Sequence, residues 1–310
     1  MALNYAEVWS PDLLEIMEQE SLTSPFVTTA VKWLSAKTFH FTQMSTSGYK
    51  SHSRLGGWNK GTFAQTDVPF TLTHDRDISF LVDKIDVDET NETASIKNIS
   101  EVFHKTQQIP EMDAYFYSKV ATEAQKLDGY HSSTALSSYT KENVYGKLKA
   151  MLSAGKLRRY VAKGALIAYV NSTIMDLLEQ STDFTRKIEM TQIAEGGIGI
   201  ETRITDIDGV TLIEVIDDER FYDKFDFTDG FAPVASTSHK INVLIASPLT
   251  VKTVPKIASI YYFNPGQHTE GDGYLYQDRS LSDTFVFPNG KDNKIDSIYV
   301  DVDTKTYSAA

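Results

Sequence analysis

Residues 94–129 read ASIKNISEVFHKTQQIPEMDAYFYSKVATEAQKLDG and predict a long amphipathic helix, because their apolar residues recur at intervals of three or four. Pro110 lies inside this pattern. Since proline lacks an N–H and its ring clashes with the preceding turn, we expect a kink or a break near Gln108. Gly129 follows the last turn and suits a C-cap. The apolar face consists of Ile96, Ile99, Phe103, Ile109, Met112, Phe116, Val120, Ala124 and Leu127.

Upstream of this helix, a long loop separates two predicted strands. Phe39–Phe41 is typical of a strand, and Ser45–Gln65 is polar and glycine-rich around an isolated Trp58. Residues 70–82 then alternate apolar and polar side chains, as a half-buried strand does. Loops of about 20 residues in compact domains are usually functional or disordered. The pattern predicts an extended β-hairpin whose tip reaches beyond its own domain and needs a neighbour, since a lone hairpin is marginally stable.

Downstream of the helix, helical and strand patterns alternate, so the expected fold class is α+β with one dominant helix. The expected elements are a helix from Thr140 as N-cap to Gly155, a strand at 165–170, a helix at 171–179 capped by Asn171 or Ser172, strands at 200–207 and 210–215 around the turn Asp208-Gly209, a strand at 241–245, a short helix from Ser247-Pro248 that Pro255 stops, and strands at 285–287 and 298–302 around a turn at Asn289-Gly290.

Composition limits the classes of function. The chain has 310 residues, a formal net charge of −12 and a pI near 5.0, and such an acidic protein is poorly suited to tight binding of nucleic acid. It has no cysteine, which excludes disulfides, thiolate zinc sites and cysteine nucleophiles. No secretory signal pattern opens the sequence and no apolar run approaches the roughly 18 residues of a membrane span, so we expect a protein made in the cytosol.

The charge is distributed unevenly. No acidic residue lies between Glu20 and Asp67, a segment that contains five basic residues: Lys32, Lys37, Lys50, Arg54 and Lys60. One interpretation is a solvated loop whose charge is accidental, and the other is an arm that lies on an acidic neighbour. Trp58 is either an anchor at a protein interface or a platform for a ligand or a base, and we favour the interface. The candidate inter-subunit contacts are Lys50, Arg54, Trp58, Asn59 and Lys60.

Motifs for catalysis or cofactor binding are missing from the sequence. No two of the seven histidines lie four residues apart, the glycine clusters at 56–57 and 196–199 match neither phosphate-binding fingerprint, and there is no GxSxG. Pairs of carboxylates are expected by chance among 42 acidic residues, and those beside turns have structural roles. We therefore expect no enzyme, no cofactor and no metal. The pairs considered are Asp206 with Asp208, Asp217 with Asp218, and Glu270 with Asp272.

Short packing and turn motifs cover most of residues 70–303. They are Leu72-Thr73, Asp75-Arg76, Phe80, Asp83-Lys84, the run from Pro110 to Tyr115, the run from Asp206 to Val210, the run from Phe227 to Phe231, the run from Ile241 to Pro248, Val251-Lys252, the run from Tyr274 to Arg279, the run from Asp283 to Val286, and the run from Ile298 to Val300. Their order and spacing resemble the major capsid proteins of tailed bacteriophages, in particular phages infecting Gram-positive bacteria. Those proteins have the HK97-like fold.

The resemblance implies five regions. They are an N-terminal arm with the first strand at 1–45, an extended hairpin (E-loop) at 46–82, a peripheral domain with a long spine helix at 83–160, a mainly axial domain at 161–250, and strands returning to the peripheral domain at 251–310. It also implies a structural subunit that self-assembles into hexamers and pentamers, forms the icosahedral head around double-stranded DNA, and is assembled in the host cytoplasm. Scaffolding protein and portal are expected partners, contacts with DNA are expected to be non-specific, and no membrane is involved.

Other functions remain open from the sequence. An encapsulin-like nanocompartment shell has the same fold and encloses protein instead of a genome. A tail-tube or connector subunit also oligomerises through hairpins, although the long helix favours a shell. A carbohydrate hydrolase would place paired carboxylates in a cleft and raise the pKa of one of them.

Overall fold

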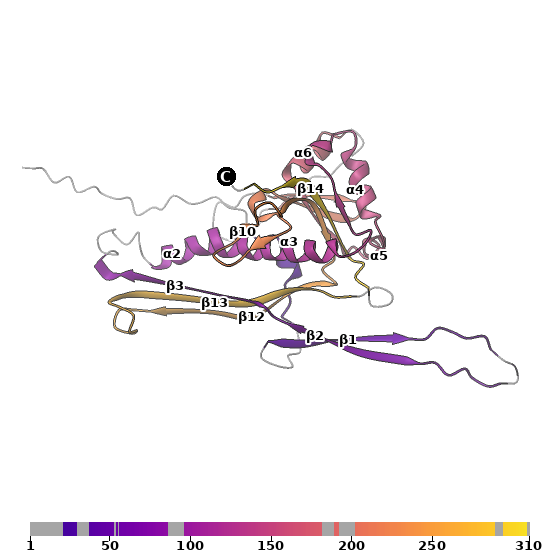
Figure 1. The fold of residues 1–310 in the computed structure, drawn as a ribbon, viewed down its shortest axis with the longest axis horizontal. Helices are drawn as coiled ribbons and strands as arrows, with labels where there is room; N and C mark the ends of the chain where they lie inside the picture. Colours follow the sequence, from indigo (N-terminus) through magenta and orange to yellow (C-terminus); the bar gives the residue numbers. More distant parts are fainter. Residues whose placement is uncertain are drawn as a thin grey trace, which may run out of the picture.

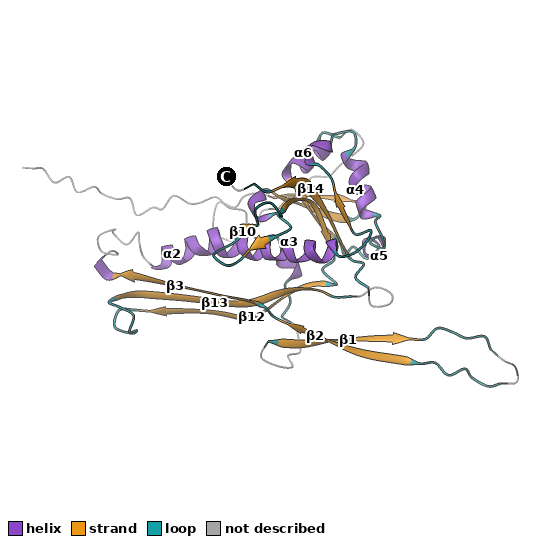
Figure 2. Cartoon of the chain, in the orientation of Figure 1, coloured by secondary structure: helices purple, strands orange, loops and turns teal. Residues whose placement is uncertain are grey.

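The computed structural model is elongated and has three parts (Figure 1). It describes residues 21–29, 37–52, 54, 56–85, 96–181, 189–191, 202–288 and 294–308. A seven-stranded sheet with short helices forms the upper body, a long helix lies above a three-stranded sheet, and a two-stranded hairpin projects from one end. Helices and strands are both abundant (Figure 2), which confirms the predicted α+β class.

The long helix contains a widened turn. It consists of α2 (Ile96–Phe103), the π-helical turn η2 (His104–Gln108) and α3 (Ile109–Gln125). The Ile109 N–H donates to the carbonyl of His104, five residues back. This wide turn leaves room for the ring of Pro110, whose missing N–H costs little in the first turn of α3. The break expected near Gln108 is confirmed as a π-turn.

The seven-stranded sheet separates two cores. Its order is β4-β14-β11-β5-β8-β7-β6. Along β11, Leu244 packs toward α3, whereas Val243 and Ile245 pack on the opposite side against the short helices, as the two-residue period of a strand requires. The strands are β4 (His131–Ser133), β5 (Ile167–Asn171), β6 (Glu189–Thr191), β7 (Thr202–Ile207), β8 (Val210–Val215), β11 (His239–Ala246) and β14 (Ile298–Thr306).

Three short helices cover the side of this sheet that faces away from α3. They are α4 (Val144–Leu152), α5 (Arg158–Val161) and α6 (Ser172–Glu179). The Asn171 side chain accepts a hydrogen bond from the Thr173 N–H, which confirms the predicted cap of α6. The predicted helix after Thr140 is also confirmed, but its N-cap is Asn143, because Thr140 lies in a preceding turn that its carbonyl closes with Val144 N–H.

The predicted hairpin between β7 and β8 is confirmed. Asp208 and Gly209 have φ of 53° and 78°, the left-handed conformations that a tight hairpin turn of this kind requires. The remaining short elements are η1 (Ser24–Phe26), η3 (Leu136–Ser138), η4 (Asp218–Arg220), β9 (Phe225–Asp226) and β10 (Ala232–Pro233).

The three-stranded sheet corrects one sequence prediction. It contains β12 (Val251–Phe263), β13 (Gly273–Val286) and β3 (His74–Asp83) in the order β12-β13-β3. The short helix predicted from Ser247 to Pro255 is wrong: residues 248–250 form a turn, and Pro255 lies within β12. Because β12 is an edge strand with a bulge after Pro255, the missing N–H is tolerated there.

The strands of the hairpin have other bounds than the expected 46–82. The hairpin consists of β1 (Thr38–Thr46) and β2 (Phe63–Thr71), so it begins before residue 46 and ends before β3. The chain turns between β2 and β3, where Leu72 is buried and the Thr73 N–H and hydroxyl donate hydrogen bonds to Asp283. The alternating segment 70–82 is therefore divided between two sheets. β14 pairs with β11 in the seven-stranded sheet, so residues 251–310 contribute strands to both large sheets. The predicted turn Asn289-Gly290 and residues 1–20 of the arm lie outside the described residues.

Candidate functional site

The base of the β1–β2 hairpin is anchored by phenylalanines. The rings of Phe39 and Phe70 stack with centroids 5.6 Å apart, and Phe285 and Phe287 pack edge-on against both. Phe39 is only 2% exposed. Such aromatic pairs stabilise beyond simple burial, so the cluster fixes the direction in which the hairpin leaves the body.

Beyond this base, no described element covers the hairpin stem (Figure 1). The antiparallel register runs without a shift from Thr38 opposite Thr71 to Thr46 opposite Phe63. Met44 is 69% exposed and Phe63 is 75% exposed. A two-stranded ribbon with exposed apolar side chains gains little from its own packing, which is typical of a segment that packs on a partner.

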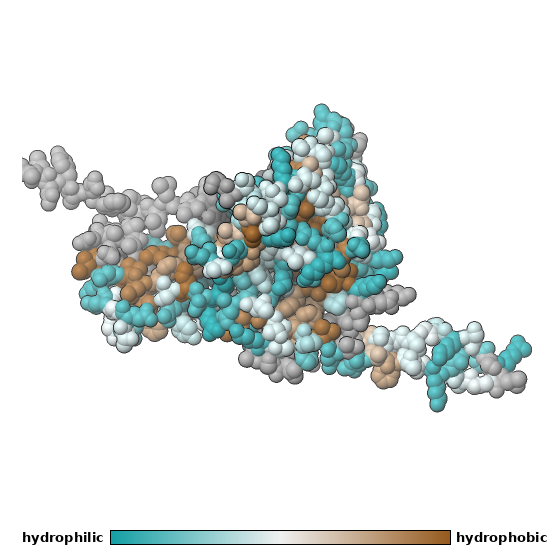
Figure 3. All heavy atoms as spheres, in the orientation of Figure 1, coloured by the Kyte–Doolittle hydropathy of each residue, from teal (hydrophilic) through white to brown (hydrophobic). Residues whose placement is uncertain are grey.

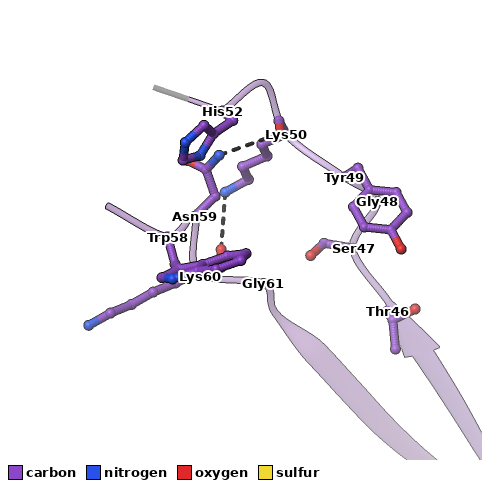
Figure 4. Close-up of a pocket in the computed structure, with 10 residues that line it drawn as sticks. All are labelled: Thr46, Ser47, Gly48, Tyr49, Lys50, His52, Trp58, Asn59, Lys60 and Gly61. Carbon is purple, nitrogen blue, oxygen red and sulfur yellow. Dashed lines mark hydrogen bonds between the residues drawn. The ribbon is translucent and has the colours of Figure 1, made fainter. Parts of the chain in front are cut away.

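The loop at the hairpin tip brings together four of the five predicted contact residues. An open concavity of about 770 Å³ between its arms (Figure 4) is lined in part by Lys50, Trp58, Asn59 and Lys60. Lys50 Nζ donates to the Lys60 carbonyl at 3.4 Å, and the Asn59 amide donates to the Ser51 carbonyl at 2.8 Å. These bonds brace the loop. Arg54 is exposed near the turn and does not line the concavity.

The tip presents an aromatic ring and positive charge to solvent. Trp58 is 96% exposed, and the Lys60 side chain points away from the loop interior (Figure 4). Within the described part of the chain, Lys50, Arg54 and Lys60 form no ion pair, whereas Lys37 at the hairpin base lies 3.0 Å from Asp75. A basic surface with an exposed tryptophan matches the anchors of protein interfaces.

A second exposed apolar surface lies at the opposite end of the molecule, where the three-stranded sheet ends (Figures 1 and 3). Exposed carboxylates of Asp83, Glu270 and Asp272 belong to the same end. The sequence reasoning missed this surface, which the run Tyr-Tyr-Phe before Asn264-Pro265-Gly266 signals. We call it the sheet tip, and its apolar residues, 48–64% exposed, are Leu81, Ile85, Ile260, Tyr261 and Tyr262.

A buried carboxylate clamps distant segments together. Asp113 of α3 accepts hydrogen bonds from the Ser21 hydroxyl at 2.9 Å, the Leu22 N–H at 3.2 Å and the Thr23 hydroxyl at 2.7 Å. Arg220 of η4 donates to the same carboxylate at 3.2 Å, and both side chains are fully buried. Burial raises the pKa of Asp113, against the opposing effect of the Arg220 guanidinium. The clamp fixes residues 21–23 and η4 on the long helix.

Three of the six carboxylates weighed for catalysis, Asp208, Asp217 and Asp218, have basic partners. Asp208 in the β7–β8 turn lies 3.4 Å from Lys149 and 4.0 Å from Arg158, and Asp217 lies 2.6 Å from Arg220. Among the described residues, no group of three or more histidines, aspartates and glutamates is placed to hold a metal. No described helix is long and apolar enough to cross a membrane.

Comparison with known proteins gives an answer at the level of the fold. No family model matches the sequence, and no curated protein matches it. A solved structure of the bacteriophage PhiM1 mature capsid matches with a TM-score of 0.64 at 12% identity, over 97% of this chain and 92% of that one. The chain has the fold of phage capsid proteins. The HK97-like architecture expected from the sequence agrees with this match.

Further solved structures agree. The capsid of cyanophage P-SCSP1u matches with a TM-score of 0.61 at 10% identity, over 98% of this chain and 94% of that one. A Mycobacterium phage Che8 structure matches with a TM-score of 0.58 at 15% identity, over 97% and 98%. Each of these matches spans nearly the whole of both chains.

Proposed function

We propose that this chain is the structural subunit of a phage head, which self-assembles into hexamers and pentamers of an icosahedral capsid around double-stranded DNA. The observation that carries the proposal is the hairpin: on a chain with a phage-capsid fold, it holds Met44, Trp58 and Phe63 exposed beyond the body. An isolated subunit leaves these side chains in water, and a neighbouring copy in a shell covers them. A structural role requires no catalytic group.

In this proposal the hairpin 38–71 takes the part of the E-loop and lies on a neighbouring copy. Lys50, Arg54, Lys60 and Trp58 are its contact residues, with Asn59 bracing the loop. The neighbour's sheet tip suits them, because it combines exposed apolar side chains with the carboxylates of Asp83, Glu270 and Asp272. Opposite charges then orient the contact and Trp58 anchors it.

The same proposal assigns a domain to each large sheet. The long helix and the three-stranded sheet would be the peripheral domain, and the seven-stranded sheet with α4, α5 and α6 would be the axial domain. A virion location, assembly in the host cytoplasm, scaffolding and portal partners, and non-specific contact with DNA belong to the same proposal. The resemblance to phages of Gram-positive bacteria stays a prediction.

The test is assembly of the purified protein, alone and with a co-expressed scaffolding candidate. Sedimentation velocity and negative-stain electron microscopy of the wild type are expected to find rings or closed shells. The triple variant Lys50→Glu/Arg54→Glu/Lys60→Glu is expected to remain monomeric with an unchanged circular dichroism spectrum. A wild-type protein that stays monomeric under every condition contradicts the proposed function. Normal shells from the variant contradict the role of the hairpin charges.

A nanocompartment shell is separated from a phage head by its contents. Particles from a phage-producing culture are expected to protect DNA from nuclease, and a nanocompartment would hold a protein cargo. The structures compared above are phage capsids, which favours the head.

A further inference from the structure

A second basic surface lies on the upper body, around α5. Residues 143–175 contain no aspartate or glutamate and six lysines and arginines. Two side chains between the basic residues, Leu157 at 0% and Tyr160 at 7% exposure, are buried and hold this segment in place. The exposed basic residues, which we call the α5 basic surface, are Lys156, Arg158, Arg159 and Lys163.

The chain neutralises only part of this charge. Arg158 lies 4.0 Å from Asp208 and Arg159 lies 3.7 Å from Asp296, but the two arginine side chains are 62% and 57% exposed. Lys156 and Lys163 form no ion pair in the part of the chain that the structure describes. The surface therefore presents unpaired cations on a protein whose net charge is negative, which favours an anionic partner.

The seven-stranded sheet has one end near α5 and a second end that lies away from α5. Near its start, β14 is preceded by Asp296, which accepts a hydrogen bond from the Tyr160 hydroxyl at 2.6 Å. Just beyond the other end of β14, Tyr307 N–H donates to Ser238 O at 2.8 Å and its ring packs on Tyr222 at 5.5 Å. The nine residues of β14 separate these ends by roughly 30 Å. Figure 1 shows α5 and β10 on opposite sides of the upper body.

The segment between β8 and β11, at this second end, is acidic. Hydrogen bonds from the Thr228 hydroxyl and N–H hold the Asp226 carboxylate and lower its pKa, so it is ionised at neutral pH. Arg220 and Lys240 pair with two members of the group, while Glu219 and Asp229 are exposed. We call this set the acidic flank, and it consists of Asp217, Asp218, Glu219, Asp226 and Asp229.

We propose that the α5 basic surface of one copy binds the acidic flank of a second copy, a head-to-tail contact within a ring. This inference rests on the proposed function and adds a contact that the hairpin does not make. A repeating head-to-tail interface needs complementary surfaces on opposite sides of each copy. Here each copy would bind one neighbour through its α5 basic surface and another neighbour through its acidic flank. Nucleic acid phosphates would also suit the basic surface, but only a second copy accounts for the matching flank.

The experiment reverses each surface in turn and then both together. The basic variant is Lys156→Glu/Lys163→Glu, the acidic variant is Glu219→Lys/Asp229→Lys, and the combined variant carries all four changes. These side chains form no ion pair within the described chain, so folding is expected to be unchanged by circular dichroism. A matched control is Lys126→Glu/Lys141→Glu, because these lysines are 60% and 61% exposed and lie outside both surfaces.

Sedimentation velocity measures the concentration at which half of the protein enters rings or shells. Each single-surface variant is expected to need about tenfold more protein than wild type or the control, and the combined variant is expected to return toward wild type. A basic variant that assembles like wild type, or a combined variant no better than either parent, overturns the inference while the proposed function stands. If the basic variant assembles like wild type but no longer binds a 30-base-pair DNA, the inference is overturned and the α5 basic surface is a nucleic acid site instead. A wild type that never assembles contradicts the proposed function itself.

Discussion

Replacing Asp113 by alanine tests how strongly the long helix holds residues 21–23. The carboxylate accepts four hydrogen bonds, three from residues 21–23 and one from Arg220, at 2.7–3.2 Å. Removing it breaks the ion pair of the fully buried Arg220 with Asp113 and takes away the carboxylate that accepts the Leu22 N–H. Breaking a buried ion pair by removing one partner destabilises by about 3–5 kcal/mol.

The assay is urea unfolding of the unassembled subunit, followed by circular dichroism. We expect Asp113→Ala to lower the free energy of unfolding by about 3–5 kcal/mol, and Arg220→Met in the same chain to restore part of the loss, with a coupling of about 1.5 kcal/mol or more. The exposed carboxylate of Asp229 provides a control, and its change to alanine is expected to stay within about 0.5 kcal/mol of wild type. A loss below about 1 kcal/mol for Asp113→Ala, or effects of Asp113 and Arg220 that simply add, would refute this reasoning.

Three further predictions concern the hairpin, the helices and pH. Phe39→Ala is expected to cost about 3–5 kcal/mol in thermal or urea unfolding and to prevent assembly; assembly at wild-type concentration would contradict the anchoring role. Gly155→Ala is expected to cost about 1–2 kcal/mol, because φ is +52° and the added Cβ would meet the Tyr130 ring; an unchanged melting temperature would contradict this. The side chains of Arg279 and Lys37 lower the pKa of Asp75 to about 2. The ionised carboxylate at this exposed site therefore stabilises the fold by less than about 1 kcal/mol above pH 3.8, and this contribution is lost as the pH falls through 2. A difference in stability between wild type and Asp75→Asn that persists below pH 2 would contradict this.

Local signals in the sequence predict local structure well. The three- and four-residue spacing around Pro110 predicts both the long helix and its interruption, since both depend on neighbours in the sequence. The same holds for the Asp208-Gly209 turn, where φ at two residues decides the hairpin. The polar, glycine-rich residues around Trp58 likewise predict an exposed ring, and the structure holds Trp58 exposed at the tip of the hairpin.

The missed features depend on contacts between distant residues. Alternation identifies the strand at 298–306 but contains no information about which sheet it joins. The sequence predicts that Pro255 ends a helix. Its place inside β12 is tolerated because β12 lies at the edge of its sheet, which the local sequence does not show. Asp113 and Arg220 are 107 residues apart, so neither stands out before the fold brings them together. The sheet tip requires β12, β13 and β3 to end side by side.

The central claim, that this chain builds a shell in which the hairpin lies on a neighbouring copy, is tested most directly by cryo-electron microscopy of the assembled wild-type particle. The account predicts an icosahedral shell in which each β1–β2 hairpin crosses onto an adjacent subunit and Trp58 is buried between the two copies. A helical tube, or a shell in which every hairpin folds back on its own subunit with Trp58 in solvent, would contradict it.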